Sequence, residues 1–298
     1  MTTSLIIPSY NPSLKLRKTL DSLVTQEVAV DELILVIDHT HYDNYVDGLK
    51  EDYHSKFNLK IVRNNDSGRG KSRNKGVEAS SGNLLIFLDD DMLCEKDLIK
   101  KHIEYHLQSP GTIVCGNGYR NPKDANYPFG KFLINMEQSW KEGVKSPSEV
   151  TFDNFSFTAC NLSLPKSIFL QLNGFDTLFT DGEDFDFAIR AIKQGIKVIY
   201  DVNLLAWHDN WPDIGDLIRR DKEYTKAKLA IFKVHPDYLV KFPHMVLKPS
   251  GKLKKIVVFL LKKPMNWFVK DRNAIFAHLP LRIKFIVYNL TISVNSVI

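Results

Sequence analysis

Short apolar runs alternate with longer amphipathic stretches through about the first hundred residues. The apolar runs have the length and the β-branched content of buried strands. Between the first two runs, Leu14, Leu20 and Leu23 recur at roughly helical spacing, which predicts a helix over 13–25. A second helix is predicted over 71–80. Strands that alternate with helices form a parallel sheet covered by helices, so the pattern predicts an α/β fold. The predicted strands are Ser4–Ser9, Glu32–Asp38, Leu59–Asn64 and Asn83–Asp89.

The rest of the chain shows a less regular pattern. Residues 110–165 are rich in Gly, Pro and Asn with few periodic runs, which predicts loops and short strands. A helix, a turn at Asn173–Gly174, a second helix from Glu183 and a strand over 197–207 are expected next. Beyond about residue 212 the helical pattern returns. We therefore predict one α/β domain over residues 1–212 and a largely helical extension over residues 213–298.

Net charge is distributed unevenly along the chain. The whole chain carries +5, but residues 241–298 contain 11 Lys or Arg against one Asp, a net charge of +10. Residues 1–240 contain 29 Lys or Arg against 34 Asp or Glu, a net charge of −5. Charges in the basic tail are interleaved with apolar and aromatic residues, including Trp267, Phe268, Phe276 and Tyr288.

Basic segments of this kind bind anionic membrane surfaces, so we expect the tail to contact such a surface. The alternative is that the tail packs on the rest of the protein or on a second copy of the chain in a homo-oligomer. No nucleic-acid-binding module accompanies the charge, which argues against a nucleic-acid partner.

Cysteine spacing and hydropathy exclude several classes of protein. Cys94, Cys115 and Cys160 lie far apart and form no CxxC pair, so neither a disulfide framework nor a thiolate zinc site is predicted. The first apolar run ends at Pro8, too early for a signal peptide. No apolar run approaches the ~18 residues of a membrane-spanning helix. We expect a cytoplasmic protein, peripheral on the inner face of the membrane if the tail binds lipid.

Three carboxylates follow the last of the four predicted strands. Asp89, Asp90 and Asp91 come directly after an apolar run. Like charges this close repel unless a cation or bound protons compensate them, and Mg²⁺ or Mn²⁺ commonly takes one or two carboxylates with substrate phosphates. Alternate side chains of an extended chain share a side, so Asp89 and Asp91 can bind one metal ion together. An acidic turn that caps the next helix is the alternative.

A second acidic cluster opens a predicted helix. Asp181, Glu183, Asp184 and Asp186 lie within six residues of one another. Acidic residues at a helix start can simply complement the helix dipole. Alternatively, one carboxylate projects into a cleft as a general base that takes a proton from a hydroxyl group. Glu183 and Asp184 are then the catalytic candidates.

Six features of the chain occur in one order over residues 3–210. They are Pro8-Ser9-Tyr10-Asn11, Asp38, Arg73-Asn74 with Gly76 and Gly82, Asp89-x-Asp91, Gly174-Phe175-Asp176, and Gly182-Glu183-Asp184. In order and approximate spacing they resemble the family 2 glycosyltransferases. The resemblance implies a nucleotide-sugar-binding GT-A fold, with a mixed, mainly parallel sheet flanked by helices. It also implies an inverting transferase with Mn²⁺ or Mg²⁺ as cofactor.

The resemblance further implies roles for individual residues. Asp184 would be the catalytic base, with Glu183 beside it. Asp89 would contact the ribose or the metal ion, Asp91 would ligate the metal ion, and Asp38 would read the edge of the base. The acceptor side would be shaped by Gly174, Phe175 and Asp176. The nucleotide-sugar would be bound by Pro8, Ser9, Tyr10, Asn11, Asp38, Arg73, Asp89 and Asp90.

Trp207 and His208 follow the predicted late strand. Related enzymes often have a histidine here near the metal or the diphosphate, and a neutral imidazole is a competent metal ligand. The resemblance therefore implies a metal-binding role for His208, although an isolated histidine is also common as a packed polar residue. Trp207 is an acceptor-side candidate that can stack on a sugar ring or pack against the protein.

These features together predict a hexosyltransferase. Its donor would be a nucleotide diphosphate sugar, with a UDP-sugar expected first and dTDP- or GDP-sugars as alternatives. Its acceptor would be a hydroxyl group of a polysaccharide or a lipid-linked oligosaccharide. Two other functions stay open: a sugar-phosphate nucleotidyltransferase and a non-catalytic sugar-nucleotide-binding scaffold. Nucleotidyltransferases resemble one another in a Gly-rich loop after the first strand, where this chain has Pro8–Asn11.

Overall fold

The structure is a computed structural model of the chain. It describes residues 1–10, 12–38, 43–66, 68–142, 144–242, 260–261, 263, 265–266, 269 and 274–295, with only the backbone of Asp38, Asp43 and Ala274. The chain forms two compact units, one of residues 1–120 and 144–209 and one of residues 121–143 and 210–298. The chain passes into the second unit at residue 210, close to the predicted boundary at 212, and the second unit also contains residues 121–143.

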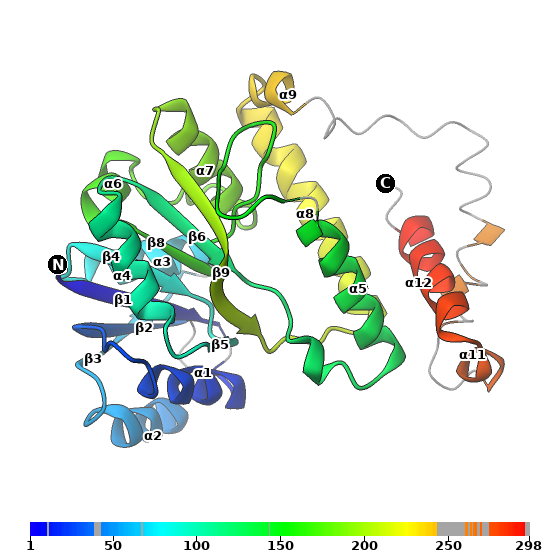
Figure 1. The fold of residues 1–298 in the computed structure, drawn as a ribbon, viewed down its shortest axis with the longest axis horizontal. Helices are drawn as coiled ribbons and strands as arrows, with labels where there is room; N and C mark the ends of the chain where they lie inside the picture. The colour runs from blue at the N-terminus through cyan, green and yellow to red at the C-terminus, as the bar shows by residue number, and fades with distance from the viewer. Residues whose placement is uncertain are drawn as a thin grey trace. The chain divides into compact units, whose positions relative to one another are not determined.

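A nine-stranded sheet forms the centre of the first unit (Figure 1). The strand order is β3-β2-β1-β4-β8-β6-β9-β5, with β7 paired to β9. β1 runs parallel to β2 and β4, whereas β8 runs antiparallel to β4 and β6. The predicted mixed, mainly parallel sheet is confirmed. The strands are β1 Thr3–Ser9, β2 Glu32–Asp38, β3 Leu59–Asn64, β4 Leu84–Leu88, β5 Met92–Cys94, β6 Ile113–Asn117, β7 Ser148–Glu149, β8 Asn161–Pro165 and β9 Val198–His208.

Helices cover both faces of this sheet, because successive side chains of a strand point to opposite faces. On β1, Leu5 and Ile7 pack with α1, α2 and α4 on one face. Ile6 packs with α3, α6 and α7 on the other face. Both predicted helices of the first hundred residues are present within two residues of their expected ends. The helices of this unit are α1 Leu14–Val24, α2 Asp43–Tyr53, α3 Arg69–Glu78, α4 Leu98–Gln108, α6 Lys166–Gln171 and α7 Glu183–Lys193.

Close packing of α3 on the sheet depends on Gly76. A Cβ atom at this position would lie 2.4 Å from Cγ2 of Ile6 and 3.1 Å from Cγ2 of Val36. Because packed carbon atoms rest about 3.5–4.0 Å apart, only glycine fits here without moving the helix away. This contact fixes the height of α3 over the sheet and therefore the place of Arg73, one turn earlier on the same helix.

A buried polar network joins α4 to β8. His102 Nδ1 lies 2.7 Å from Ser163 Oγ, and its Nε2 lies 2.8 Å from Asn161 Oδ1. The Asn161 amide donates to two backbone carbonyls, so its Oδ1 accepts and His102 carries its proton on Nε2. Ser163 Oγ then donates to His102 and accepts from His106 Nε2 at 2.8 Å. Burial lowers the pKa of both histidines to about 4, so both are neutral at pH 7.

The second unit is helical in its described residues (Figure 1). Phe129 and Phe132 of α5 pack with Phe276 and Tyr288 in an apolar core, and the rings of Phe129 and Tyr288 meet edge to face at 4.9 Å. None of the helices in the described part of the chain is long and apolar enough to cross a membrane. Trp267 and Phe268 lie outside the described residues. The helices are η1 Pro122–Asp124, α5 Pro128–Glu142, α8 Ile214–Val234, α9 Tyr238–Lys241, α11 Ala274–His278 and α12 Leu281–Asn295.

The expectation of loops and short strands over residues 110–165 is confirmed by β6, β7 and β8, but it is wrong for α5, a helix of 15 residues. Phe129, Phe132 and Leu133 are buried along one side of it, at the spacing of an amphipathic helix. The Gly, Pro and Asn residues lie mostly in the segments that flank α5. The average composition of residues 110–165 therefore concealed the periodic apolar residues of α5.

Candidate active site

One buried guanidinium joins the two acidic clusters. Arg73 of α3 is 3% exposed, its Nη1 donates to Glu183 Oε1 at 2.6 Å, and its Nη2 donates to Asp89 Oδ1 at 2.8 Å. Asp89 directly follows β4, and Glu183 is the first residue of α7. The guanidinium also lies over the ring of Phe175, 5.6 Å from its centroid. Arg73 therefore ties the carboxyl end of the central sheet to the start of α7.

The two carboxylates on Arg73 differ in how easily they ionise. Burial opposes ionisation of Asp89, but the positive charges of Arg73 and Arg69 outweigh it and hold the pKa of Asp89 below its usual value. Burial and the neighbouring Asp184 raise the pKa of Glu183, although Arg73 opposes this. Asp89 therefore stays ionised beside Arg73 more readily than Glu183 does, and Glu183 is the more easily protonated of the two carboxyl groups.

Asp184 is the more accessible of the two catalytic candidates. Glu183 is 2% exposed, whereas Asp184 is half-buried. The Oδ1 atom of Asp184 accepts a hydrogen bond from the backbone N–H of Phe185 at 2.8 Å. Asp184 lies in the first turn of α7, where the helix dipole stabilises negative charge. A carboxylate placed this way can receive a proton from a hydroxyl group, while Glu183 is enclosed and paired.

Asp91 and His208 form a close pair beside this bridge. His208 Nε2 lies 2.9 Å from Asp91 Oδ1. The two residues meet because β5 pairs with the end of β9, which sets Met92 opposite His208. Burial lowers the pKa of His208, but the hydrogen bond to Asp91 and its charge outweigh burial, so the pKa lies above its usual value.

The Asp91–His208 pair suits a divalent cation. Hard cations such as Mn²⁺ and Mg²⁺ take carboxylate oxygens and complete their coordination with water and substrate phosphates. The imidazole of His208 favours Mn²⁺, a first-row transition metal, over Mg²⁺. Asp89 instead directs Oδ1 at Arg73. Among the described side chains, no three His, Cys, Asp or Glu residues form a group that could hold a metal ion, and metal binding stays a prediction.

Asp90 connects the acidic cluster to the end of β1. Its Oδ2 accepts a hydrogen bond from Ser9 Oγ, and its backbone oxygen accepts one from Thr19 Oγ1 at 3.0 Å. Burial raises the pKa of Asp90 to about 7; the charges of Asp91 and Asp89 act in the same direction, and the bond from Ser9 opposes them. Ser9 is thus held beside the predicted metal ligands.

The other predicted nucleotide-binding residues lie at the ends of β1 and β2. Pro8 is the penultimate residue of β1, and the Tyr10 ring that follows the strand is 55% exposed. Ser9 pairs with Ile37 across the two parallel strands, so the strand ends are adjacent. Asn11 and the side chain of Asp38 lie outside the described residues. Nucleotide binding by this group stays a prediction.

Asn74 anchors the Gly174–Asp176 segment to α3. Its Nδ2 donates to the carbonyl of Phe175 at 2.8 Å, and its Oδ1 accepts from the Phe175 N–H at 3.0 Å. Gly174 has φ of +65°, in the left-handed region that favours glycine. Phe175 is 1% exposed and packs in the core. The segment therefore has a clear packing role, and its predicted acceptor-side role stays a prediction.

Arg190 holds the same turn from α7, and the sequence analysis missed it. Its guanidinium donates to the carbonyls of Leu172 and Gly174, and its Nε donates to the fully buried Asp186 at 2.7 Å. The i, i+4 spacing of Asp186 and Arg190 is the signal that could have revealed the pair.

Trp207 projects from the opposite side of β9 to His208, since alternate residues of a strand point in opposite directions. Its indole Nε1 donates to Glu95 Oε1 at 2.7 Å. This bond holds the Trp207 ring beside Glu95, the residue that follows β5. Stacking of the ring on an acceptor sugar stays a prediction.

Comparison with known proteins decides the family. Residues 4–162 match the family described as Glycosyl transferase family 2. The chain belongs to this family. The predicted family is thus confirmed, and a family 2 glycosyltransferase transfers a sugar from a nucleotide-sugar donor. This assignment favours sugar transfer over the nucleotidyltransferase and scaffold alternatives.

Relatives of this glycosyltransferase act in glycan assembly according to their names. It is 31% identical over 219 residues to the O-antigen chain rhamnosyltransferase RfbN of Salmonella typhimurium, covering 70% of this chain and 67% of the relative. It is 23% identical over 294 residues, 93% of this chain and 91% of the relative, to the dolichyl N-acetyl-alpha-D-glucosaminyl phosphate 3-beta-D-2,3-diacetamido-2,3-dideoxy-beta-D-glucuronosyltransferase of Methanococcus voltae.

A solved structure supports the GT-A fold of the glycosyltransferase. The mannosyltransferase PcManGT from Pyrobaculum calidifontis, in complex with GDP-Man and Mn²⁺, matches 99% of this chain and 86% of its own with a TM-score of 0.59. Sequence identity between the two is 16%, so the likeness concerns the fold.

Proposed function

We propose that this glycosyltransferase is an inverting, metal-dependent hexosyltransferase that uses a UDP-sugar. The observation that carries the proposal is the bridge from Arg73 to Asp89 and Glu183, at 2.8 Å and 2.6 Å. A single displacement needs donor and acceptor groups at one place, in line with each other. The bridge supports this arrangement because it joins the strand-end acids to the start of α7.

Asp184 acts as the base in this proposal. It is half-buried at the first turn of α7 and can take the proton of an acceptor hydroxyl as the oxygen attacks the anomeric carbon. Attack on the face opposite the departing diphosphate inverts the anomeric configuration, through an oxocarbenium-like transition state. The Glu183 carboxylate is instead engaged by Arg73, so it is not available to take this proton, and the contact fixes the first turn of α7.

Asp91 and His208 would hold the cation, with Mn²⁺ preferred to Mg²⁺. A divalent ion bound there supplies positive charge against the diphosphate as it departs. Ser9, whose hydroxyl donates to Asp90, would contact the nucleotide at the end of β1. GDP-Man and Mn²⁺ in the mannosyltransferase relative support this class of donor and cofactor.

The acceptor in this proposal is a polysaccharide or a lipid-linked oligosaccharide. The names of the Salmonella and Methanococcus relatives, an O-antigen chain and a dolichyl phosphate glycan, support this class. We place the enzyme at the cytoplasmic face of the membrane. Ile283, Ile286 and Leu290 recur along α12 and are 43%, 58% and 47% exposed, and the last 58 residues carry a net charge of +10. An exposed apolar helix face in a basic segment suits an anionic bilayer surface.

Two substitutions test the catalytic roles. Asp184→Asn should bind a UDP-sugar with Mn²⁺ as the wild type does, while transfer falls by about 10²–10⁴-fold because the base is lost. Asp91→Ala should lose the Mn²⁺-dependent part of donor affinity measured by calorimetry. Asp181→Asn, a neighbouring acid paired with the exposed Arg69 at 3.2 Å, is the matched control. Near-normal turnover of Asp184→Asn, or unchanged Mn²⁺ dependence of Asp91→Ala, would reassign these roles.

The donor and the membrane contact need separate measurements. Thermal shift with UDP-, dTDP- and GDP-sugars in Mn²⁺ identifies the donor, because a ligand raises stability in proportion to ln(1 + [L]/Kd). Sedimentation with anionic vesicles tests the membrane contact. Ile286→Glu should release the enzyme into the supernatant, whereas the same substitution at Leu107, an exposed residue of α4, should not.

A further inference from the structure

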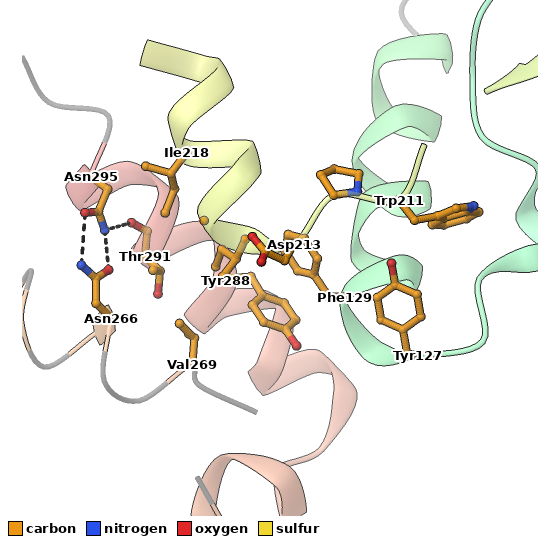
Figure 2. A pocket seen from close by; sticks show the side chains of 13 residues that line it. Tyr127, Phe129, Trp211, Asp213, Ile218, Asn266, Val269, Tyr288, Thr291 and Asn295 are labelled. Carbon is orange, nitrogen blue, oxygen red and sulfur yellow. Dashed lines mark hydrogen bonds between the residues drawn. The ribbon is translucent and has the colours of Figure 1, made fainter. Parts of the chain in front are cut away.

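A cavity of about 690 Å³ lies within the second unit, and none of the described residues that line it belongs to the candidate active site (Figure 2). Its volume is in the range of sites that enclose small organic molecules. Much of its wall is aromatic or aliphatic, including Phe129, Trp211, Ile218, Val269 and Tyr288. These side chains come from α5, from the turn into α8, from α8 itself, from the segment before α11 and from α12.

Four polar side chains in this wall, Asn266, Asn295, Thr291 and Asp213, already have hydrogen-bond partners within the protein. Asn295 Nδ2 donates to Asn266 Oδ1 at 2.7 Å, and Asn266 donates back at 3.3 Å (Figure 2). Thr291 Oγ1 donates to the backbone at 2.8 Å. Asp213 accepts the N–H of Asp216 at 2.7 Å as the cap of α8. A polar ligand would lose its hydrogen bonds to water and gain few here, so the cavity suits a hydrocarbon chain.

A second pocket of about 330 Å³ adjoins this cavity, because both are lined by Gly215 and Ile218. The rest of its wall is Arg219, Lys222, Glu223 and Lys226 of α8. Glu223 is paired with Arg219 and Arg220, each at 3.2 Å. Within the described part of the chain, the ion pairs do not include Lys222 or Lys226. Their ammonium groups can therefore receive an anionic headgroup.

We propose that the two pockets form one site for an amphiphile with a single hydrocarbon chain and a phosphate headgroup. The chain lies in the apolar cavity, and the phosphate lies against Lys222 and Lys226. Ile218 stands at the boundary, since it lines both pockets. That such a molecule carries the acceptor glycan rests on the proposed function, whereas binding of the amphiphile does not require the catalytic residues.

Chain length provides the first test. Binding of octyl phosphate, decyl phosphate and inorganic phosphate to the full chain is measured by calorimetry, below the micelle concentration of each amphiphile. Each buried methylene group should tighten binding about fourfold, so decyl phosphate should bind about 15-fold more tightly than octyl phosphate. Inorganic phosphate should bind too weakly to detect. Equal affinity for the two alkyl phosphates would overturn the proposal.

Matched tryptophan substitutions on α8 locate the chain. Ile218→Trp should fill the cavity and weaken decyl phosphate binding at least tenfold. Leu229→Trp places the same side chain at an exposed position of the same helix, 43% exposed, and should leave binding unchanged. If Ile218→Trp does not fold, Ile218→Ser tests the same contact, because it removes apolar surface and should weaken binding about tenfold. Equal binding by the position-218 and position-229 variants would overturn the proposal.

The lysines are tested against an uncharged headgroup. Lys222→Ala and Lys226→Ala should each weaken decyl phosphate binding about fivefold at low salt, and less as salt screens the charges. Decyl maltoside, which carries no charge, should bind both variants as it binds the wild type. Lys228→Ala and Lys233→Ala, exposed on the same helix, are the controls. Equal losses for all four variants would show only a general charge effect and would overturn the phosphate site.

Donor hydrolysis in Mn²⁺ is measured on the same samples. Chain-length-dependent binding without donor hydrolysis would contradict the proposed function and leave the amphiphile site standing. Donor hydrolysis without chain-length-dependent binding would remove the amphiphile site and leave the proposed function standing.

Discussion

Lowering the pH from 8 to 5.5 should weaken the first unit through two buried histidines of α4. The pKa of His102 and of His106 is about 4 in the folded chain, against an ordinary value of 6.5. When the pKa of a histidine is lower in the folded state than in the unfolded state, the free energy of unfolding is unaffected by its protonation above the unfolded pKa and decreases as the pH falls below that value. As the pH falls below 6.5, the unfolded chain binds protons that the folded chain does not. The loss therefore develops between pH 6.5 and about 4.

The size of this loss follows from the two pKa values. At pH 5.5 an unfolded histidine is mostly protonated, while a folded one with a pKa of about 4 is almost entirely neutral. Integrating the proton difference from pH 8 to pH 5.5 gives between about 1 and 2 kcal/mol per histidine and about 3 kcal/mol for the pair. Folded proteins are stable by only about 5–15 kcal/mol, so a change of this size is measurable.

The assay compares urea unfolding at the two pH values for the wild type and His106→Leu. Nδ1 of His106 is buried without a hydrogen-bond partner, so leucine removes the titrating group and one hydrogen bond. The stability lost between pH 8 and 5.5 should be smaller in the variant by about 1–2 kcal/mol. His54→Gln, at an exposed position in the turn after α2, should behave as the wild type does. Parallel losses in wild type and His106→Leu would refute the reasoning.

Two further substitutions test the packing around the acidic site. Arg73→Lys should cost about 3 kcal/mol of unfolding free energy, because one ammonium cannot reach both Asp89 and Glu183 and leaves a buried carboxylate unpaired. Urea titration at pH 7 measures this cost. Gly174→Ala should cost about 2 kcal/mol or more, because a Cβ at φ +65° is strained and would also lie 2.9 Å from Asn74 Oδ1. Thermal denaturation measures that loss.

Each of these substitutions has a control of the same kind. Arg69 is 47% exposed and pairs with Asp181, so Arg69→Lys should cost less than about 1 kcal/mol. Gly111 has φ of +78° with no atom within 4 Å of a built Cβ, so Gly111→Ala carries the backbone strain alone. Equal losses within either pair would mean that the described contacts do not govern stability.

Most of the first unit was predictable because its strands and helices are coded by local patterns. β1 contains the apolar run Leu5–Ile7, and Leu16, Leu20 and Leu23 of α1 are buried at helical spacing. The helix α5 was missed, since its apolar positions lie within a segment whose average composition is that of loops. A periodicity count over a shorter window would have found Phe129, Phe132 and Leu133.

The candidate site was predictable in its residue types but not in its connections. The acids that follow β4 and those that open α7 stand out in the sequence. Asp91 and His208, which were predicted separately as metal ligands, lie 2.9 Å apart, and metal binding by them stays a prediction. Nucleotide binding by Arg73 stays a prediction, and the contacts of its two Nη atoms with carboxylates from different elements could not be read from the sequence. The clamp of Arg190 on the Gly174 turn gave only a weak local signal.

The sequence by itself determined the α/β class, the order of the motifs and the contrast between an acidic body and a basic tail. These properties depend on residue periodicity and composition, which are local or additive along the chain. Only the tertiary structure decided that Arg73 shares its charge between Asp89 and Glu183, and that the apolar cavity adjoins Lys222 and Lys226. Such contacts depend on how closely separate elements approach one another in three dimensions, and that distance is set by packing rather than by any local pattern.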